Sequence, residues 1–383
     1  MKTESNGFES ILPGGGHDVV GMVQLRDGRI WAPSKGCIAY ISEDGGRTWG
    51  SPVPMDYDGM AHGVLRLRSG ALALTYSRDA DPARAIPGHA VGGLYLRKSH
   101  DEGKTWGAEV EVAGPAAKLD CLYDTLIQTS TGRLIWPAYA SFAQPIAGLQ
   151  PRTSDDRYPQ FAVVKVLYSD DEGETWAESE HNLFLWETEG LGRAGLLLQA
   201  TVAETAAGGL LMFGHAFATR VAEAYSDDWG ETWSLVRLND LCTCDSPARV
   251  ARIPSSGDLV VVWNQTTAAE CARGLNRCRL TAAVSEDSGK TWGHFRNIML
   301  QPGLEENARL VDPEPAHFVK PEYNIRTGFL RGGYPNVHFF GDMVYVHYEF
   351  VEGRLPSGQG SAGEPKVGQK LRVLPVEWFY EGR

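Results

Sequence analysis

The chain has 383 residues, 43% of them hydrophobic and 22% charged, which is typical of a globular protein that buries a large core. Its formal net charge of −12 argues against a nucleic-acid partner, because phosphate binding requires a basic surface. No apolar run is long enough to cross a bilayer, and the N-terminus lacks the apolar segment of a signal peptide. We therefore expect no membrane partner and a cytoplasmic location.

Six stretches of alternating apolar residues, each interrupted by a glycine-containing turn, recur along the chain. This alternation and these turn residues predict β-hairpins, and further apolar segments between the hairpins predict third strands. The hairpins are predicted at residues 22–33, 64–76, 126–139, 200–213, 248–263 and 336–348, and the clearest third strands at 36–41, 91–98 and 161–168.

The third strands lead into a turn with the pattern S-x-D-x-G-x-T-W, which begins at Ser42, Ser99, Ser169, Ser226 and Ser285. We expect its aspartate to accept hydrogen bonds from its own turn, its glycine to take a positive φ, and its tryptophan to seal the gap between adjacent sheets. Copies that point in different radial directions cannot converge on one site. We therefore interpret the motif as scaffold rather than as a calcium or sugar site.

Six units of four strands predict an all-β fold, a six-bladed β-propeller of four-stranded antiparallel blades, in a single domain over residues 1–383. The sixth unit lacks the S-x-D-x-G-x-T-W turn. We expect the strand-like segment 370–380 and the N-terminal segment 8–13 to complete it, so that the termini are joined in the last blade. Long insertions on such a scaffold often carry function, and they are predicted at 79–90, 142–160, 266–278, 301–332 and 352–369.

The residues just before each innermost strand of a propeller should converge at one central mouth. They are His17 and Asp18 in blade one, His62 in blade two, Asp120, Tyr123 and Asp124 in blade three, Arg193 and Gln199 in blade four, Asp245, Ser246 and Arg249 in blade five, and Arg331 and Tyr334 in blade six. Each one taken alone is explained equally well as a turn cap, a buried histidine or a paired arginine. Together they predict a polar pocket.

Five of these residues are candidates for catalysis. Asp18 or Asp124 could serve as a general acid or base, and His17 or His62 is an alternative whose ordinary pKa is near neutrality. Tyr334 could act as a nucleophile or as a donor that stabilises charge. The six cysteines match no zinc-binding pattern, so we expect free thiols, no metal and no other cofactor.

The candidates for substrate binding combine guanidinium groups, which bind carboxylates in a forked geometry, with polar groups that could bind hydroxyls. They are Arg249, Arg331, Gln199, Arg193, Arg279, Tyr123 and Asp245.

The repeated turns resemble the Asp boxes of the sialidase (neuraminidase) superfamily, and the resemblance extends over essentially the whole chain. Residues 132–139 resemble the third-blade hairpin of sialidases, and residues 246–265 with 279–292 resemble bacterial sialidase-like proteins of unproven substrate. The resemblance implies a six-bladed propeller. For a true sialidase it also implies a tyrosine nucleophile assisted by a glutamate, an aspartate as acid/base, and three arginines that hold the sugar carboxylate.

Only part of that constellation is matched here. Tyr334 lies in the expected Gly-Tyr context before the first strand of the last blade. Gln199 stands where the glutamate is expected, unless Glu187 or Glu189 replaces it, and His17 and Asp18 stand where the first arginine is expected. For the remaining arginine positions the candidates are Arg220, Arg249 and Arg279.

The sequence therefore predicts an exo-acting glycoside hydrolase of sialidase-like type that removes a terminal, acidic or unusual sugar from a glycan. Two alternatives remain open. One is a polysaccharide lyase that uses histidine and tyrosine as base and acid. The other is a non-catalytic carbohydrate-binding propeller, which the glutamine at position 199 favours.

Overall fold

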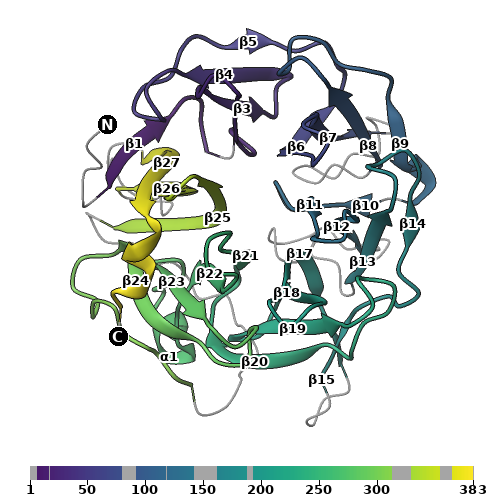
Figure 1. Cartoon of the computed structure of the whole chain (residues 1–383). Helices are drawn as coiled ribbons and strands as arrows, with labels where there is room; N and C mark the ends of the chain where they lie inside the picture. The colour runs from purple at the N-terminus through teal and green to yellow at the C-terminus, as the bar shows by residue number, and fades with distance from the viewer. Residues whose placement is uncertain are drawn as a thin grey trace, which may run out of the picture.

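Six antiparallel blades are arranged around a central axis (Figure 1), and β10 (Leu119–Asp120) joins blades two and three into one continuous sheet. The computed structural model describes residues 7–16, 18–79, 92–117, 119–141, 162–187, 193–312, 329–353 and 365–382. Within these ranges the chain is almost entirely strand and turn, with one short α-helix, α1 (Ala268–Ala272). No described helix has the length and apolarity required to cross a membrane.

Each blade has four main strands, and the first one lies nearest the axis (Figure 1). Blade one contains β2 (Val23–Gln24), β3 (Ile30–Ser34), β4 (Ile38–Ser42) and β5 (Val53–Pro54). Blade two contains β6 (Met60–Arg66), β7 (Leu72–Asp79), β8 (Gly92–Ser99) and β9 (Val110–Ala113). Blade three contains β11 (Ile127–Gln128), β12 (Leu134–Ser141), β13 (Ala162–Ser169) and β14 (Ala177–Glu178).

Blades four and five follow the same order. Blade four contains β17 (Leu197–Glu204), β18 (Leu210–Ala216), β19 (Arg220–Ser226) and β20 (Arg237–Cys242). Blade five contains β21 (Arg249–Arg252), β22 (Leu259–Asn264), β23 (Arg279–Ser285) and β24 (Gly293–Leu300). These strands confirm the predicted hairpins and third strands. Two additions were not predicted: β10 (Leu119–Asp120), which pairs with both β8 and β12, and a hairpin of β15 (Leu185–Glu187) and β16 (Arg193–Gly195).

Blade six joins the two ends of the chain, as predicted. Its order is β25 (Leu330–Phe340), β26 (Met343–Glu352), β27 (Lys366–Pro375) and, outermost, β1 (Phe8–Leu12). The prediction of a strand through residue 380 is wrong, because the chain turns into a 3₁₀ helix over Val376–Tyr380. This turn buries Phe379 in the core and lets the Tyr380 hydroxyl donate a hydrogen bond to Asp258, 2.6 Å away.

The five Asp boxes share one hydrogen-bond pattern. In the first, the Asp44 carboxylate accepts from the Thr48 amide at 2.9 Å and the Thr48 hydroxyl at 2.6 Å, and the Ser42 hydroxyl accepts from the Gly46 amide at 2.7 Å. The other four boxes repeat these bonds. The expected role of the aspartate as a clasp for its own turn is confirmed.

The Asp-box tryptophans lie between sheets. Trp106 of blade two packs against Trp31 of blade one in a tilted arrangement with 5.8 Å between ring centroids, and the ring of Trp292 in blade five lies 5.6 Å from that of Phe213 in blade four. Packing such large rings between the sheets removes apolar area from water and stabilises the junction. The predicted sealing role is confirmed at these two junctions.

Candidate functional site

Three of the residues predicted to converge at the mouth have a left-handed backbone although they are not glycine: Asp124 (φ 56°), Gln199 (φ 49°) and Tyr334 (φ 52°). Gln199 and Tyr334 lie in β-bulges, because the register of β17 shifts after Leu198 and that of β25 shifts after Gly333. Such conformations cost free energy and are concentrated at functional sites. The innermost strands are therefore distorted at the positions that the sequence singled out.

Tyr334 lies beneath a guanidinium group. The Arg277 guanidinium carbon is 5.0 Å from the centre of the Tyr334 ring, within the range of a cation–π interaction. Arg277 Nε and Nη2 donate to the backbone carbonyl of Asp245 at 3.0 and 2.7 Å, which fixes the plane of the guanidinium. Burial would lower the pKa of Arg277, but its electrostatic interactions with Tyr334 and Asp245 outweigh burial and raise the pKa. Arg277 is thus a fixed cation at the tyrosine.

A histidine links the distorted position in blade four to blade five. His215 Nδ1 is 2.9 Å from the Gln199 side-chain oxygen, and His215 Nε2 is 2.6 Å from a carboxylate oxygen of Asp245. His215 is almost fully buried, and the side chain of Asp245 is 19% exposed. The same aspartate therefore holds His215 with its side chain and Arg277 with its backbone.

A second cation lies over a second tyrosine ring. The Lys35 ammonium is 4.4 Å from the centre of the Tyr123 ring, and that ring also stacks on His62 with 6.0 Å between centroids. Burial lowers the pKa of Lys35, and the carboxylates of Asp18 and Glu349 oppose this shift. Lys35 therefore resembles Arg277 in being a partly buried cation on an aromatic face with acidic groups nearby.

Shared electrostatic neighbours connect the two cations. The Glu349 carboxylate acts to raise the pKa of both Lys35 and Arg277 through electrostatic attraction. Tyr334 and Glu349 both contribute to raising the pKa of Tyr123. We call Lys35, Tyr123, Arg277, Tyr334 and Glu349 the axial cluster. It combines two cations, two phenols and a carboxylate contributed by four blades.

Arg249 forms a structural link below the cluster. It is only 6% exposed, and its guanidinium donates to the carbonyls of Asp124 at 2.7 Å and Pro335 at 3.3 Å, to the carbonyl of Tyr123 and to the side chain of Asn336. Burial lowers its pKa to about 10. Because these bonds use its nitrogens within the protein, we assign Arg249 a structural role instead of the predicted contact with substrate.

Asp124 completes this layer, which we call the axial floor (Asp124, Arg249, Asn336, His338 and His347). Its carboxylate accepts from the Val64 amide at 3.2 Å and lies 3.3 Å from His338 Nδ1. Added Cβ atoms at Gly21 and Gly63 would come within 2.6 Å of it, so the two glycines make room for the side chain. Burial raises the pKa of Asp124 to about 7.

The remaining predicted residues occupy different environments. Asp18 is partly exposed, accepts from the Gly15 amide and acts electrostatically on Lys35, which places it beside the axial cluster. His62 is 1% exposed, its Nε2 is 2.8 Å from the Ser77 hydroxyl, and its ring packs against Tyr123. Burial lowers its pKa to about 4. Asp120 is also buried and accepts from the Tyr139 hydroxyl at 2.6 Å.

Arg279 has a partner inside the protein. It is 2% exposed and pairs with Glu270 of α1 at 3.0 Å, so we assign it a structural role. Ser246 is buried and donates to Asn264 at 2.6 Å. Arg331 lies on β25 and pairs in register with Val351. His17 lies outside the described residues, as does the side chain of Arg193.

Four residues near the mouth were missed by the sequence reasoning: Lys35, His215, Arg277 and Glu349. Each lies at the end of a second strand or just before a third strand, and these ends share a face of the propeller with the starts of the first strands. The available signal was topological. Polar residues at all three strand ends of this face should have been considered, not only those that precede the innermost strands.

No group of three or more metal-binding side chains is found in the described part of the chain. All six cysteines are free, and five of them are buried.

A family described as a BNR repeat-like domain matches residues 87–324. No curated protein sequence matches the chain. Among solved structures, a protein of unknown function from Dyadobacter fermentans is similar, with a TM-score of 0.59 and 15% identity over 97% of this chain and 98% of that one.

Two sialidases are also similar in structure. The Trypanosoma rangeli sialidase in complex with sialic acid has a TM-score of 0.54 and 14% identity over 97% of this chain and 58% of its own. The NanB sialidase of Streptococcus pneumoniae has a TM-score of 0.56 and 14% identity over 97% and 71%. The chain thus spans less than two thirds of the Trypanosoma enzyme. At these identities the likeness establishes the fold.

Proposed function

Because the chain belongs to the BNR repeat-like domain family and has the sialidase-like propeller fold, we propose that it is an exo-acting glycoside hydrolase. Its substrate is a glycan end that carries an acidic sugar. The observation that carries this proposal is the pairing of Arg277 with Tyr334, a fixed cation over a phenol in a strained bulge near the axis. Sialic acid itself is bound by one of the structural neighbours, and here acidic sugars are the proposed class.

In this proposal the two cations bind and orient the sugar. Arg277 presents a planar guanidinium to the sugar carboxylate, and Lys35 adds a second positive charge. Neither cation has to be organised when the sugar arrives, because the Asp245 carbonyl and the Tyr123 ring already hold them.

The reaction adds water across the bond between the anomeric carbon and the leaving oxygen. Asp18 gives its proton to the leaving oxygen as that bond breaks, and the phenolic oxygen of Tyr334 stabilises the positive charge that develops on the carbon. The oxygen of a water molecule then bonds to the anomeric carbon, and the proton released by that water returns to Asp18. Atoms and charge balance without a cofactor.

The test is a panel of sialosides, glucuronides and matched neutral glycosides, assayed for released reducing sugar and for absorbance of an unsaturated product in the ultraviolet. We expect reducing sugar from an acidic substrate, and a loss of kcat of about 100-fold or more in both Tyr334→Phe and Asp18→Asn. Ser10→Ala, a substitution on the outermost strand of blade six, is the control and should retain wild-type turnover. An ultraviolet-absorbing product would instead identify a lyase.

A non-catalytic sugar-binding propeller is the second candidate, and one observation favours it. The amide of Gln199 cannot take a proton, and its oxygen is already engaged by His215. Calorimetric binding of an acidic sugar without turnover, weakened by Arg277→Ala, would support this alternative and exclude the hydrolase.

A further inference from the structure

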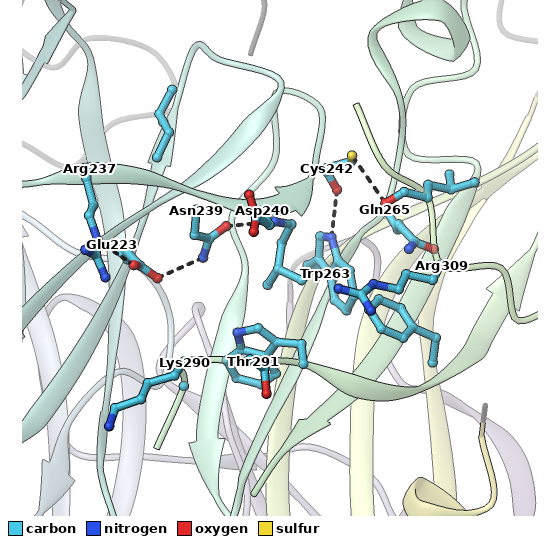
Figure 2. A pocket seen from close by; sticks show the side chains of 16 residues that line it. Glu223, Arg237, Asn239, Asp240, Cys242, Trp263, Gln265, Lys290, Thr291 and Arg309 are labelled. Atoms are coloured by element: carbon cyan, nitrogen blue, oxygen red, sulfur yellow. Dashed lines mark hydrogen bonds and ion pairs between the residues drawn. The ribbon is translucent and has the colours of Figure 1, made fainter. Parts of the chain in front are cut away.

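A cavity lies away from the axial cluster, between the outer strand of blade four and the strands of blade five (Figure 2). Its volume is about 280 Å³, and its lining shares no residue with the axial cluster. Figure 2 shows Arg237 and Lys290 toward one end of the cavity and Gln265 and Arg309 toward the other. The lining also includes the buried rings of Trp263, Trp292 and Phe295.

Gln265 has an unused donor at this cavity. Its side chain is 1% exposed, and its amide nitrogen has no hydrogen-bond partner among the residues that the structure describes. A buried amide donor left without an acceptor costs about 1–3 kcal/mol, so natural proteins rarely leave one unsatisfied.

A chain of hydrogen bonds fixes which end of this amide is free. The backbone amide of Asn307 donates to the Asn297 side-chain oxygen at 2.6 Å, so the Asn297 nitrogen must face the Thr281 hydroxyl, 3.0 Å away. Thr281 accepts that bond and donates its own hydrogen to the Gln265 oxygen at 3.3 Å. The Gln265 nitrogen is therefore the end that remains available.

The charges around the cavity favour an anion. Arg237 is already paired with Glu223 at 2.8 Å, and the exposed Asp240 lies 3.3 Å from Arg220. Within the described ranges, Lys290 and Arg309 have no carboxylate partner, and the Arg309 guanidinium lies 5.7 Å from the centre of the Phe295 ring. The cavity thus has two uncompensated cations and one buried neutral donor.

We propose that this cavity binds one acidic monosaccharide unit, whose carboxylate accepts hydrogen bonds from the Gln265 amide and the Arg309 guanidinium. A volume of about 280 Å³ lies at the small end of ligand sites and fits one sugar ring rather than an oligosaccharide. The polar groups at the other end of the cavity, including Arg237 and Lys290, face the sugar hydroxyls. This site is independent of the proposed hydrolysis at the axis.

The proposal is tested by isothermal titration calorimetry of the Arg277→Ala protein, whose axial cluster is impaired, with glucuronate, N-acetylneuraminate, glucose and acetate. We expect a sugar acid to bind at one site and glucose to bind at least tenfold more weakly. Adding Arg309→Ala or Gln265→Leu should weaken the sugar acid at least tenfold. Arg296→Ala, which removes a blade-five guanidinium outside the cavity, is the matched control and should leave the affinity unchanged.

Three results would overturn the proposal. The first is no binding of either sugar acid, which would mean that water alone satisfies Gln265. The second is unchanged binding of the sugar acid to the Arg309→Ala variant. Because Arg309 is exposed, this substitution leaves the core intact, and a loss of binding would reflect a lost contact and not misfolding. The third is acetate binding as tightly as glucuronate, which would reduce the site to a general carboxylate site.

Discussion

Asp124 and the Asp-box aspartates place the same side chain in two regions of one propeller, with opposite effects on its protonation. In the box of blade two, hydrogen bonds from the Thr105 hydroxyl and amide hold the pKa of Asp101 at about 2. At the axial floor, burial raises the pKa of Asp124 to about 7, although the Arg249 cation opposes the shift. One carboxylate is stabilised as an anion by its own turn, and the other is held where its charge is costly.

The difference lies in where the partners come from. The Asp boxes bond to residues two and four positions away, so each turn is satisfied by its own segment. Asp124 depends on other blades, with its carboxylate beside Val64 and His338 and its carbonyl bound by Arg249, 125 residues away in sequence. Local motifs can repeat, whereas the floor forms only when the ring closes.

The largest expected effect is on the floor itself. Arg249→Leu leaves the carbonyls of Tyr123 and Asp124 without their donor, so we expect a loss of about 3–5 kcal/mol in the free energy of unfolding. Arg252→Leu on the same strand removes a partly exposed ion pair with Glu204, 3.0 Å away, and should cost less than about 1 kcal/mol. Urea unfolding followed by tryptophan fluorescence measures both. Equal losses of unfolding free energy in the two variants would show that the buried contacts of Arg249 stabilise the fold no more than the partly exposed ion pair of Arg252.

A smaller effect should appear in the pH dependence of stability. His347 is fully buried and stacks on His338 at 5.3 Å, and burial lowers its pKa to about 3. The unfolded chain binds the extra proton between pH 6.5 and 3, so the histidine costs stability as pH falls through that window. The limiting slope is about 1.4 kcal/mol per pH unit. His347→Leu should flatten this fall.

Asp124 has the opposite sign. Because its folded pKa is raised, the native state holds the extra proton between about pH 4 and 7, and stability is lost as pH rises through that range. Asp124→Asn should therefore remove this loss and steepen the net rise of stability with pH. Unfolding titrations at pH 4, 5, 6 and 7 measure both variants. Parallel curves for wild type and the two variants would contradict the assignment of charge at the floor.

The same contrast explains what the sequence could predict. The interactions that form a hairpin or an Asp box lie within about a dozen residues, so the repeats predicted six blades. The missing Asp box of the sixth unit then predicted its closure by β1. The 3₁₀ turn at Val376–Tyr380 was missed because its aromatic residues look like a strand, whereas its partners, among them Asp258 and Arg296, are distant in sequence. Local sequence contains no information about that partner.

At the site, the starts of the innermost strands identified Gln199 and Tyr334, both of which the structure places in left-handed bulges. The structural role of Arg249 was not visible, because its acceptors in blades three and six are more than 80 residues away in sequence. Lys35 and Arg277 were missed because the criterion considered first strands alone. The residues of a propeller site come from several blades, so they are found by asking which strand ends lie on the same face and not by their closeness in sequence.

The smallest expected effect is in a single Asp box. In blade three, the Asp171 carboxylate accepts from the Thr175 amide at 2.9 Å and hydroxyl at 2.6 Å, and its pKa is about 2 because these bonds outweigh a burial cost. Asp171→Asn keeps one acceptor and loses the charge, so we expect about 1 kcal/mol less stability at pH 7. Because the folded pKa is depressed, this contribution is complete above about pH 4 and disappears as pH falls toward 2. The unfolding curves of variant and wild type should therefore converge at pH 2.

Glu174→Gln, in the same turn but 61% exposed and paired with Lys98, should change stability by less than about 0.5 kcal/mol at any pH. If the difference in the free energy of unfolding between Asp171→Asn and wild type were the same at pH 2 as at pH 7, the charge of the Asp171 carboxylate would not contribute to the stability of the turn.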